Sequence, residues 1–262
     1  MNPAALYQSA LEDAVTCLKR EASGPRKTVS LSPEVAALLA IAGPATVPPG
    51  GVRPAATPPA APPDPAAAAI GDPAAALAAL AKAVSGCEKC SLCKTRTQTV
   101  FGVGNIHADL VFVGEAPGAD EDRQGEPFVG KAGQLLTDII VKGMKMRRED
   151  VYICNVLKCR PPDNRTPNPE EMALCEPYLI QQLDLIRPKV ICALGAVAAK
   201  CLLKTDDSVG RMRGRWHHYQ GIPLRVTYHP AYLLRKPEDK RKTWDDVQEI
   251  MKVLSGEAAP GA

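Results

Sequence analysis

The stretch that decides the fold is Leu110-Val111-Phe112-Val113-Gly114-Glu115-Ala116-Pro117-Gly118, which continues to Gly125-Glu126-Pro127-Phe128-Val129-Gly130-Lys131-Ala132-Gly133. Its first four residues form a short apolar run that stops at a glycine, which is typical of a strand buried on both faces. Residues 134–140 then carry apolar side chains at helical spacing. The stretch therefore predicts a strand, a long loop rich in glycine and proline, and a helix.

The loop in this stretch is the first candidate for a functional site. It holds carboxylates at Glu115, Asp120, Glu121 and Asp122, and a single aromatic side chain, Phe128. In α/β sheets, ligands bind in the crevice at the carboxyl ends of the strands. The alternative reading is a plain turn-rich connection between a strand and a helix.

Further apolar runs follow, with helical stretches between them. Strands are predicted over 151–156, 190–194 and 223–227, and helices over 74–84, 132–143, 169–185, 195–203 and 245–254. Strands that alternate with helices predict a three-layer αβα fold with a mainly parallel central sheet. Glu115, Asn155 and His229 each follow a predicted strand, so we expect them to meet at one crevice.

The composition divides the chain into four parts. Residues 1–42 hold two short helical patterns, and 43–71 form a segment rich in Pro and Ala that we expect to act as an extended tether. The folded domain is predicted over 72–255, starting with Asp72-Pro73 as a helix cap, and 256–262 as a disordered tail. Within the domain, Asn168-Pro169-Glu170-Glu171 is a second helix start, with Asn168 as the cap and Glu171 reaching back to it.

Charge and hydropathy limit the partners. The formal net charge of the 262 residues is +3, so a nucleic-acid partner requires a local basic face rather than bulk charge. The sequence holds no run of 18 apolar residues, and its first twenty residues do not resemble a secretory signal. We therefore expect a cytoplasmic protein that does not enter a membrane.

The nine cysteines are read as reduced thiols, some of which hold a metal. Cys87, Cys90 and Cys93 lie close together, and Cys159 and Cys175 follow much later. Two local thiols and two distant ones suit either Zn²⁺ or an iron–sulfur cluster, and spacing alone selects neither the metal nor Cys90 over Cys93. The other four, in apolar runs or in the N-terminal helical pattern, are expected to be plain thiols: Cys17, Cys154, Cys192 and Cys201.

Five separated motifs within 85–253 together resemble family 4 uracil-DNA glycosylase, the iron–sulfur branch of the uracil-DNA glycosylase superfamily. They are Cys87-x2-Cys90, the Gly114–Gly118 loop with Pro127–Gly133, Asn155-Val156-x2-Cys159-Arg160-Pro161-Pro162, Cys175, and His229-Pro230-x2-Leu233-Leu234-Arg235. The resemblance implies a [4Fe-4S] cluster on Cys87, Cys90, Cys159 and Cys175, with Cys93 free. It implies nothing about residues 1–71. The covalent-trapping branch is excluded, because 160–167 lack its inserted basic loop and histidine.

The implied activity is base-excision repair of DNA: a hydrolase that flips uracil out and breaks its N-glycosidic bond. Phe128 suits a stacking platform, and the Asn155 amide suits the uracil edge. His229 suits a donor to O2, where negative charge gathers, and Glu115 suits the group that orients water. Ala116 and Pro117 are expected to contact the base, and Glu121 to crowd out the thymine methyl. For each side chain the bland alternative is a structural role.

A basic surface and a wedge are expected to hold single- or double-stranded uracil-containing DNA. The candidates are Arg211, Arg213, Arg215, Leu234 and Arg235. We expect a monomer whose N-terminal extension tethers another protein. Two other functions remain open: an iron–sulfur nucleic-acid-binding module without catalysis, and a zinc-stabilised α/β nucleotide hydrolase.

Overall fold

The computed structural model describes residues 72–259, and within them it confirms the predicted three-layer αβα class. The central sheet has six strands in the order β1-β3-β2-β4-β6-β5. In chain order these are Val103–Gly104, Leu110–Gly114, Tyr152–Asn155, Val190–Leu194, Trp216–Tyr219 and Ile222–Thr227. The four inner strands are parallel, and β1 and β5 close the two edges in antiparallel pairing.

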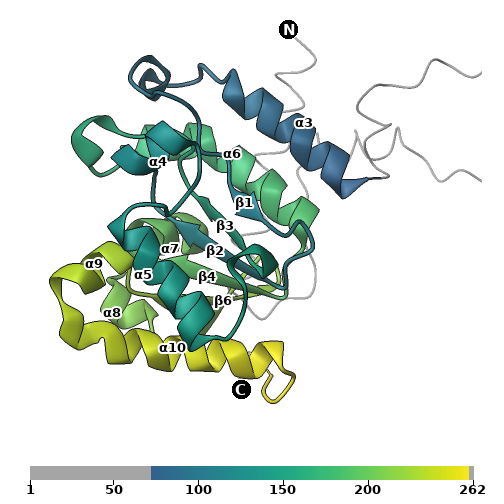
Figure 1. Ribbon diagram of the computed structural model, residues 1–262, viewed down its shortest axis with the longest axis vertical. Coiled ribbons are helices and arrows are strands. Elements are labelled where there is room, and N and C mark those ends of the chain that lie inside the picture. Colours follow the sequence, from purple (N-terminus) through teal and green to yellow (C-terminus); the bar gives the residue numbers. More distant parts are fainter. Residues whose placement is uncertain (1–71, 260–262) are drawn as a thin grey trace, which may run out of the picture. The chain divides into compact units, whose positions relative to one another are not determined.

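Eight α-helices flank the described sheet (Figure 1). They are α3 Pro73–Ser85, α4 Ala119–Gln124, α5 Lys131–Asp138, α6 Pro169–Ile186, α7 Gly195–Leu203, α8 Val209–Met212, α9 Pro230–Arg235 and α10 Lys240–Leu254. Helix α5 continues into a single π-helical turn, Ile139–Gly143. Short 3₁₀ turns cover 91–94, 148–150, 162–164 and 237–239.

Alternating side chains of each strand build two cores. Val111 and Val113 of β2 face α6 and α7, whereas Leu110 and Phe112 face α5 and α10. Both sets are fully buried, which explains why β2 reads as a continuous apolar run rather than as an alternating pattern. Helix α3 packs on α6 through Leu80, Val84 and Tyr178, at the outside of the first core.

The helix starts follow their caps, with one correction. The Asp72 side chain accepts the Ala74 N–H at 2.9 Å, as predicted. The Asn168 side chain makes no capping bond; instead Glu171 accepts the Asn168 N–H at 2.9 Å and pairs with Arg165. Glu171 alone therefore secures the start of α6. The predicted buried thiols Cys154, Cys192 and Cys201 are indeed buried.

Several elements are absent from the sequence-based description. Helix α4 interrupts the segment expected to be a loop, and α10 starts at Lys240 rather than Asp245, because 240–244 are too polar to show an apolar period. Strand β5 pairs with β6 across Gln220 and Gly221, whose φ values of +48° and +82° fit a type I′ hairpin turn. Helix α9 directly follows His229. The predicted helices before residue 72 lie outside the described residues.

Between residues 72 and 259, none of the helices combines the length and apolarity needed to cross a membrane.

The carboxylate of Asp246 fixes α10 to the end of β6. Asp246 is completely buried and accepts hydrogen bonds from Arg213 Nε at 3.0 Å, the Gly214 N–H at 3.2 Å and Thr227 Oγ1 at 3.0 Å. The buried Arg225 guanidinium lies 3.4 Å away. Thr227 precedes Tyr228 and His229, so this network positions the segment that carries the histidine.

Replacing Asp246 with Ala is expected to lower the free energy of unfolding by about 3–5 kcal/mol, because it leaves the buried Arg225 and the partly buried Arg213 without their counter-charge. Urea unfolding followed by circular dichroism measures this change. The matched control is Asp245→Ala, which removes the neighbouring, exposed carboxylate and is expected to cost less than about 0.5 kcal/mol. Equal stabilities of the two variants would contradict the structural role of Asp246.

Candidate functional site

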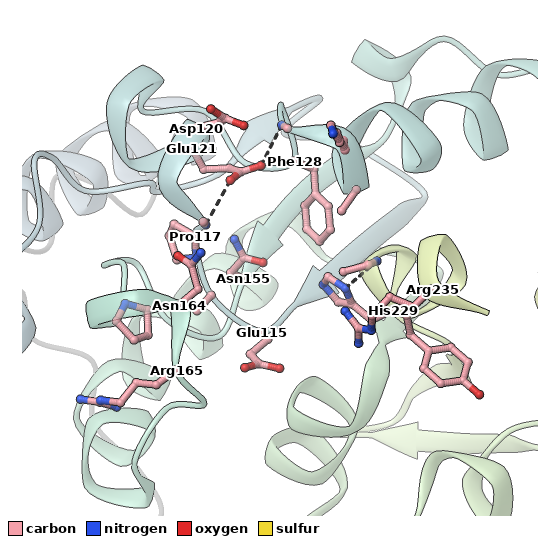
Figure 2. Close-up of a pocket in the computed structure, with 18 residues that line it drawn as sticks. Glu115, Pro117, Asp120, Glu121, Phe128, Asn155, Asn164, Arg165, His229 and Arg235 are labelled. Atoms are coloured by element: carbon pink, nitrogen blue, oxygen red, sulfur yellow. Dashed lines mark hydrogen bonds between the residues drawn. The ribbon is translucent and has the colours of Figure 1, made fainter. Parts of the chain in front are cut away.

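The loop after β2 is folded into a cup by the Glu121 carboxylate. One oxygen accepts the Gly118 N–H at 3.1 Å, and the other accepts the N–H groups of Val129 and Gly130, both at 3.0 Å. Figure 2 shows this carboxylate bridging the two sides of the cup. Glu121 therefore joins the segment after β2 to the start of α5. The sequence predicts that it also faces the base, and this stays a prediction.

Gly114 lets two pocket side chains approach the strand end. A Cβ at this residue would lie 2.3 Å from Asn155 Oδ1 and 2.5 Å from the Phe128 ring. Any side chain at 114 would therefore displace both residues. Strands β2 and β3 are parallel neighbours, and their register places Gly114 directly opposite Asn155. The close approach of Asn155 to Gly114 therefore follows from the strand pairing.

Asn155 is buried at the carboxyl end of β3, with 1 % of its surface exposed. Its Oδ1 atom has no hydrogen-bond partner within the described residues. A buried amide oxygen without a partner is costly, so it calls for a ligand that donates a hydrogen bond. Asn155 therefore offers a buried amide oxygen to a hydrogen-bond donor in this pocket.

Phe128 and His229 form one wall of the pocket. Their ring centroids lie 5.6 Å apart with a tilt of 34°. Phe128 is 5 % exposed and also packs in the core beside α5 and α10. The ring therefore lines the pocket and contributes to core packing at the same time. The wall thus offers one flat aromatic face and one imidazole.

The hydrogen bonding of His229 fixes its tautomer. Nδ1 accepts the Ala231 N–H at 3.1 Å, which caps the short helix α9. The ring proton must then lie on Nε2, the only other ring nitrogen. Burial of the ring, with the nearby Arg235 charge, lowers the pKa of His229 to about 4. His229 is therefore a neutral Nε2–H donor at ordinary pH.

Glu115 follows β2 directly and lies opposite this wall (Figure 2). Burial raises the pKa of the Glu115 carboxyl above its ordinary value. A carboxylate with a raised pKa is a better proton acceptor near neutral pH than an exposed one.

One pocket brings together every residue that the sequence assigned to base binding and catalysis. Glu115, Ala116, Pro117, Glu121, Phe128, Asn155 and His229 all line it. Several further residues line the pocket that were not assigned to it from the sequence, among them Lys131, Asn164 and Arg165. No pocket residue is assigned within 160–167 from the sequence. The signal that could have found one is Pro161-Pro162-Asp163-Asn164, which is typical of a turn, and Asp163 and Asn164 both adopt positive φ.

The predicted DNA-contact residues fall in different surroundings. Arg235 lines the pocket and Leu234 on α9 is 44 % exposed. Arg211 and Arg215 are exposed, and Arg211 pairs with Asp207. Arg213 is different, since its guanidinium is bound to Asp246 and to the Lys242 carbonyl. Two of its nitrogen atoms, Nε and Nη2, thus already donate inside the fold.

A second cavity collects four of the candidate thiols: Cys87, Cys90, Cys159 and Cys175. Cys93 does not line it. Arg96 Nη1 donates to Cys159 Sγ at 3.2 Å, and the Lys158 N–H donates to Cys175 Sγ at 3.3 Å. Donors aimed at sulfur suit thiolates. In the part of the chain that the structure describes, no three of the possible ligands converge closely enough for a single metal ion.

Comparison with known proteins sets the class. Residues 101–248 match the family model described as the uracil DNA glycosylase superfamily. The chain is similar to the type-4 uracil-DNA glycosylase of Archaeoglobus fulgidus, with 46 % identity over 179 residues, which cover 65 % of this chain and 89 % of that protein. The enzymes of the same name from Pyrobaculum aerophilum and Thermotoga maritima are 48 % and 44 % identical, over 82 % and 92 % of their lengths and 59 % and 66 % of this chain. The chain belongs to the uracil-DNA glycosylase superfamily and, within it, to the type-4 family.

We expect His229 to stay neutral from pH 5 to 8, because its pKa of about 4 lies well below the usual value near ~6.5. As pH falls below the usual value, the unfolded chain takes up a proton that the folded chain refuses, so stability declines towards pH 4. Imidazole ¹⁵N NMR, assigned with His229→Asn, should show an Nε2–H tautomer without titration in this range. A titration near pH 6.5 would refute the assignment.

Proposed function

We propose that this chain is a DNA-repair enzyme that removes uracil from DNA by hydrolysing its N-glycosidic bond and leaves an abasic site. The observation that carries the proposal is the buried Asn155 amide, whose Oδ1 lacks a partner, beside Phe128 and His229 in one pocket. The type-4 uracil-DNA glycosylases named above support the same activity.

Recognition of uracil needs a face and an edge. The Phe128 ring provides the face, where stacking of one base contributes about 1–3 kcal/mol. Asn155 Oδ1 accepts the hydrogen on uracil N3, and the Asn155 NH₂ group donates to O4. Cytosine offers the opposite pattern, with an acceptor at N3 and a donor at C4, so a fixed amide rejects it. Ala116, Pro117 and Glu121 complete the wall around the flipped base.

Bond cleavage leaves negative charge on the departing uracil, chiefly at O2. The Nε2–H of His229 is the donor for this atom. Because the neutral imidazole already carries this hydrogen, His229 does not have to take up a proton before it can donate. Such a donor stabilises the transition state because it is already in place when the charge develops. The Glu115 carboxylate orients the attacking water and favours the cationic sugar.

DNA is held around the pocket mouth rather than inside it. Arg235 and the exposed Leu234 follow His229 on α9, which places a phosphate contact and a wedge beside the flipped base. Arg211 and Arg215 extend the basic surface. Both single- and double-stranded DNA can use such backbone contacts.

The four thiols of the second cavity are proposed to hold a [4Fe-4S] cluster. Their donor set is the one such clusters take, and two of the four sulfur atoms, those of Cys159 and Cys175, already receive hydrogen bonds. A single Zn²⁺ could take the same four thiolates, and the metal content of the purified protein distinguishes it from the cluster. The cluster would connect the segments before β1, after β3 and within α6, and hydrolysis requires no electron from it.

The alternatives identified from the sequence are not favoured. A binding module without catalysis has no need for an intact pocket, and here Glu115, Phe128, Asn155 and His229 share one. The monomeric state, the cytoplasmic location and a partner for the N-terminal extension stay predictions.

A labelled oligonucleotide with a single uracil tests the activity. After incubation and alkali treatment, we expect strand cleavage at uracil only, and none when thymine replaces it. His229→Asn keeps a side chain able to cap α9 but loses the reach to O2, and is expected to slow cleavage by ~10²–10³. Asn155→Ala is expected to abolish it. Uncleaved DNA from wild-type protein with its cluster loaded would favour the binding module instead.

Cluster content is tested separately by anaerobic purification. Wild-type protein should show the visible absorption of an iron–sulfur cluster and about four iron atoms per chain. Cys90→Ala is expected to lose both, whereas Cys93→Ala, three residues away, is expected to retain them because Cys93 lies outside the cavity. One zinc per chain with no visible absorption would contradict the cluster, and loss of iron in Cys93→Ala would contradict the ligand set.

A further inference from the structure

The inference concerns the backbone that carries the aromatic wall. Phe128 has φ of +56°, the left-handed region that a bulky residue adopts at a cost. The start of α5 leaves it little room, because a Cβ at Gly133 would lie 1.9 Å from the Phe128 carbonyl carbon and oxygen. This conformation therefore requires groups that hold it in place.

Two oppositely charged side chains hold the peptide groups around Phe128. Glu121 accepts the N–H groups of Val129 and Gly130, as described above. Arg148 donates from Nη2 to the Pro127 carbonyl at 2.7 Å and to the Phe128 carbonyl at 3.2 Å. The carboxylate thus binds the donors of this turn, and the guanidinium binds its acceptors.

Arg148 is itself fixed. It lies in the 3₁₀ turn Arg148–Asp150 before β3, and its side chain is 20 % exposed. Its Nη1 donates to Thr137 Oγ1 on α5 at 3.0 Å, and the Glu126 carboxylate lies 3.6 Å from Nη2. One planar guanidinium therefore joins the Phe128 turn to α5, an arrangement that a lysine cannot reproduce.

The loop has open space on the side where Arg148 lies. A further hollow, separate from the base pocket and from the cysteine cavity, is lined by Phe128, Val129, Thr137 and Arg148. Arg148 does not line the base pocket, so it touches neither the base nor the reacting atoms. Hydrogen bonds from a charged donor are stronger than those from a neutral one. The Arg148 guanidinium can therefore hold the Phe128 turn on the side where other side chains do not pack against it.

We propose that Arg148 is a positioning residue that sets the Phe128 ring for stacking on the base. This rests on the proposed function, in that Phe128 is the stacking platform. Without the guanidinium, the turn relaxes towards an ordinary φ and the ring leaves its place beside Asn155 and His229.

The adjacent arginine supplies a matched control. Arg147 is 71 % exposed and pairs with Asp150, away from the Phe128 turn. We expect Arg148→Ala to lower kcat/KM on single-uracil DNA by about 10- to 100-fold, and Arg147→Ala to leave it unchanged. Affinity for undamaged DNA should be equal in both variants, because the phosphate contacts lie elsewhere. An unchanged kcat/KM in Arg148→Ala would overturn the proposal.

A double-mutant cycle with Phe128→Ala identifies the route of the effect. If Arg148 acts through Phe128, Arg148→Ala has no further effect once the ring is absent. An additional loss of the same size in the Phe128→Ala background would instead assign Arg148 a general structural role and overturn the proposal. Should Arg148→Ala fail to fold, Arg148→Lys at an unchanged melting temperature serves in the same cycle.

A measurement without turnover separates this inference from the activity. In wild-type protein, NOEs are expected between the Phe128 and His229 rings, whose centroids lie 5.6 Å apart. They should weaken or vanish in Arg148→Ala, or in Arg148→Lys if that variant replaces it, and persist in Arg147→Ala. Wild-type protein that does not cleave uracil would refute the proposed function alone, whereas unchanged NOEs would refute the positioning role alone.

Discussion

The constraint on which this molecule depends is the balance of peptide hydrogen bonds in the turn that follows β2. Residues 115–130 lead from the end of β2 to the start of α5, and those of their N–H and C=O groups that are shielded from water need partners within the protein. Glu121 satisfies donors on both sides of the cup with one carboxylate. The pocket is the space that this closed cup leaves at the strand ends, and its aromatic wall is part of the cup itself.

Register then brings the remaining groups to that space. Gly114 lies opposite Asn155 because β2 and β3 are parallel neighbours, and the absence of a side chain at 114 admits the amide and the ring together. On the other side, Asp246 ties α10 to Thr227, two residues before His229. Electrostatics complete the arrangement: burial keeps His229 neutral, and burial also raises the pKa of Glu115, which makes its carboxylate a better proton acceptor.

The sequence predicts much of this because buried parallel strands leave a strong signal. The apolar runs ending at Gly114, Asn155 and Thr227 placed Glu115, Asn155 and His229 at one edge, and the pocket confirms that they meet. Helix α4 and Arg148 leave no such signal, since α4 is polar throughout and Arg148 acts on carbonyl oxygens distant in the sequence. Arg213 shows another limit of the sequence. From the sequence alone, a basic residue that could bind DNA cannot be told from one that, like Arg213, binds a buried carboxylate.

The short segment from Asn155 to Cys159 joins the base pocket, which Asn155 lines, to the cysteine cavity, which Cys159 lines. Lys158 is buried between the two cavities, with its Nζ donating to the Asn155 carbonyl at 2.8 Å and to Gln182, while its own N–H reaches Cys175. The base pocket and the cysteine cavity are thus lined by neighbouring residues of one short segment, Asn155 in the first and Lys158 and Cys159 in the second. A backbone shift at either cavity would therefore be transmitted over only a few residues to the other.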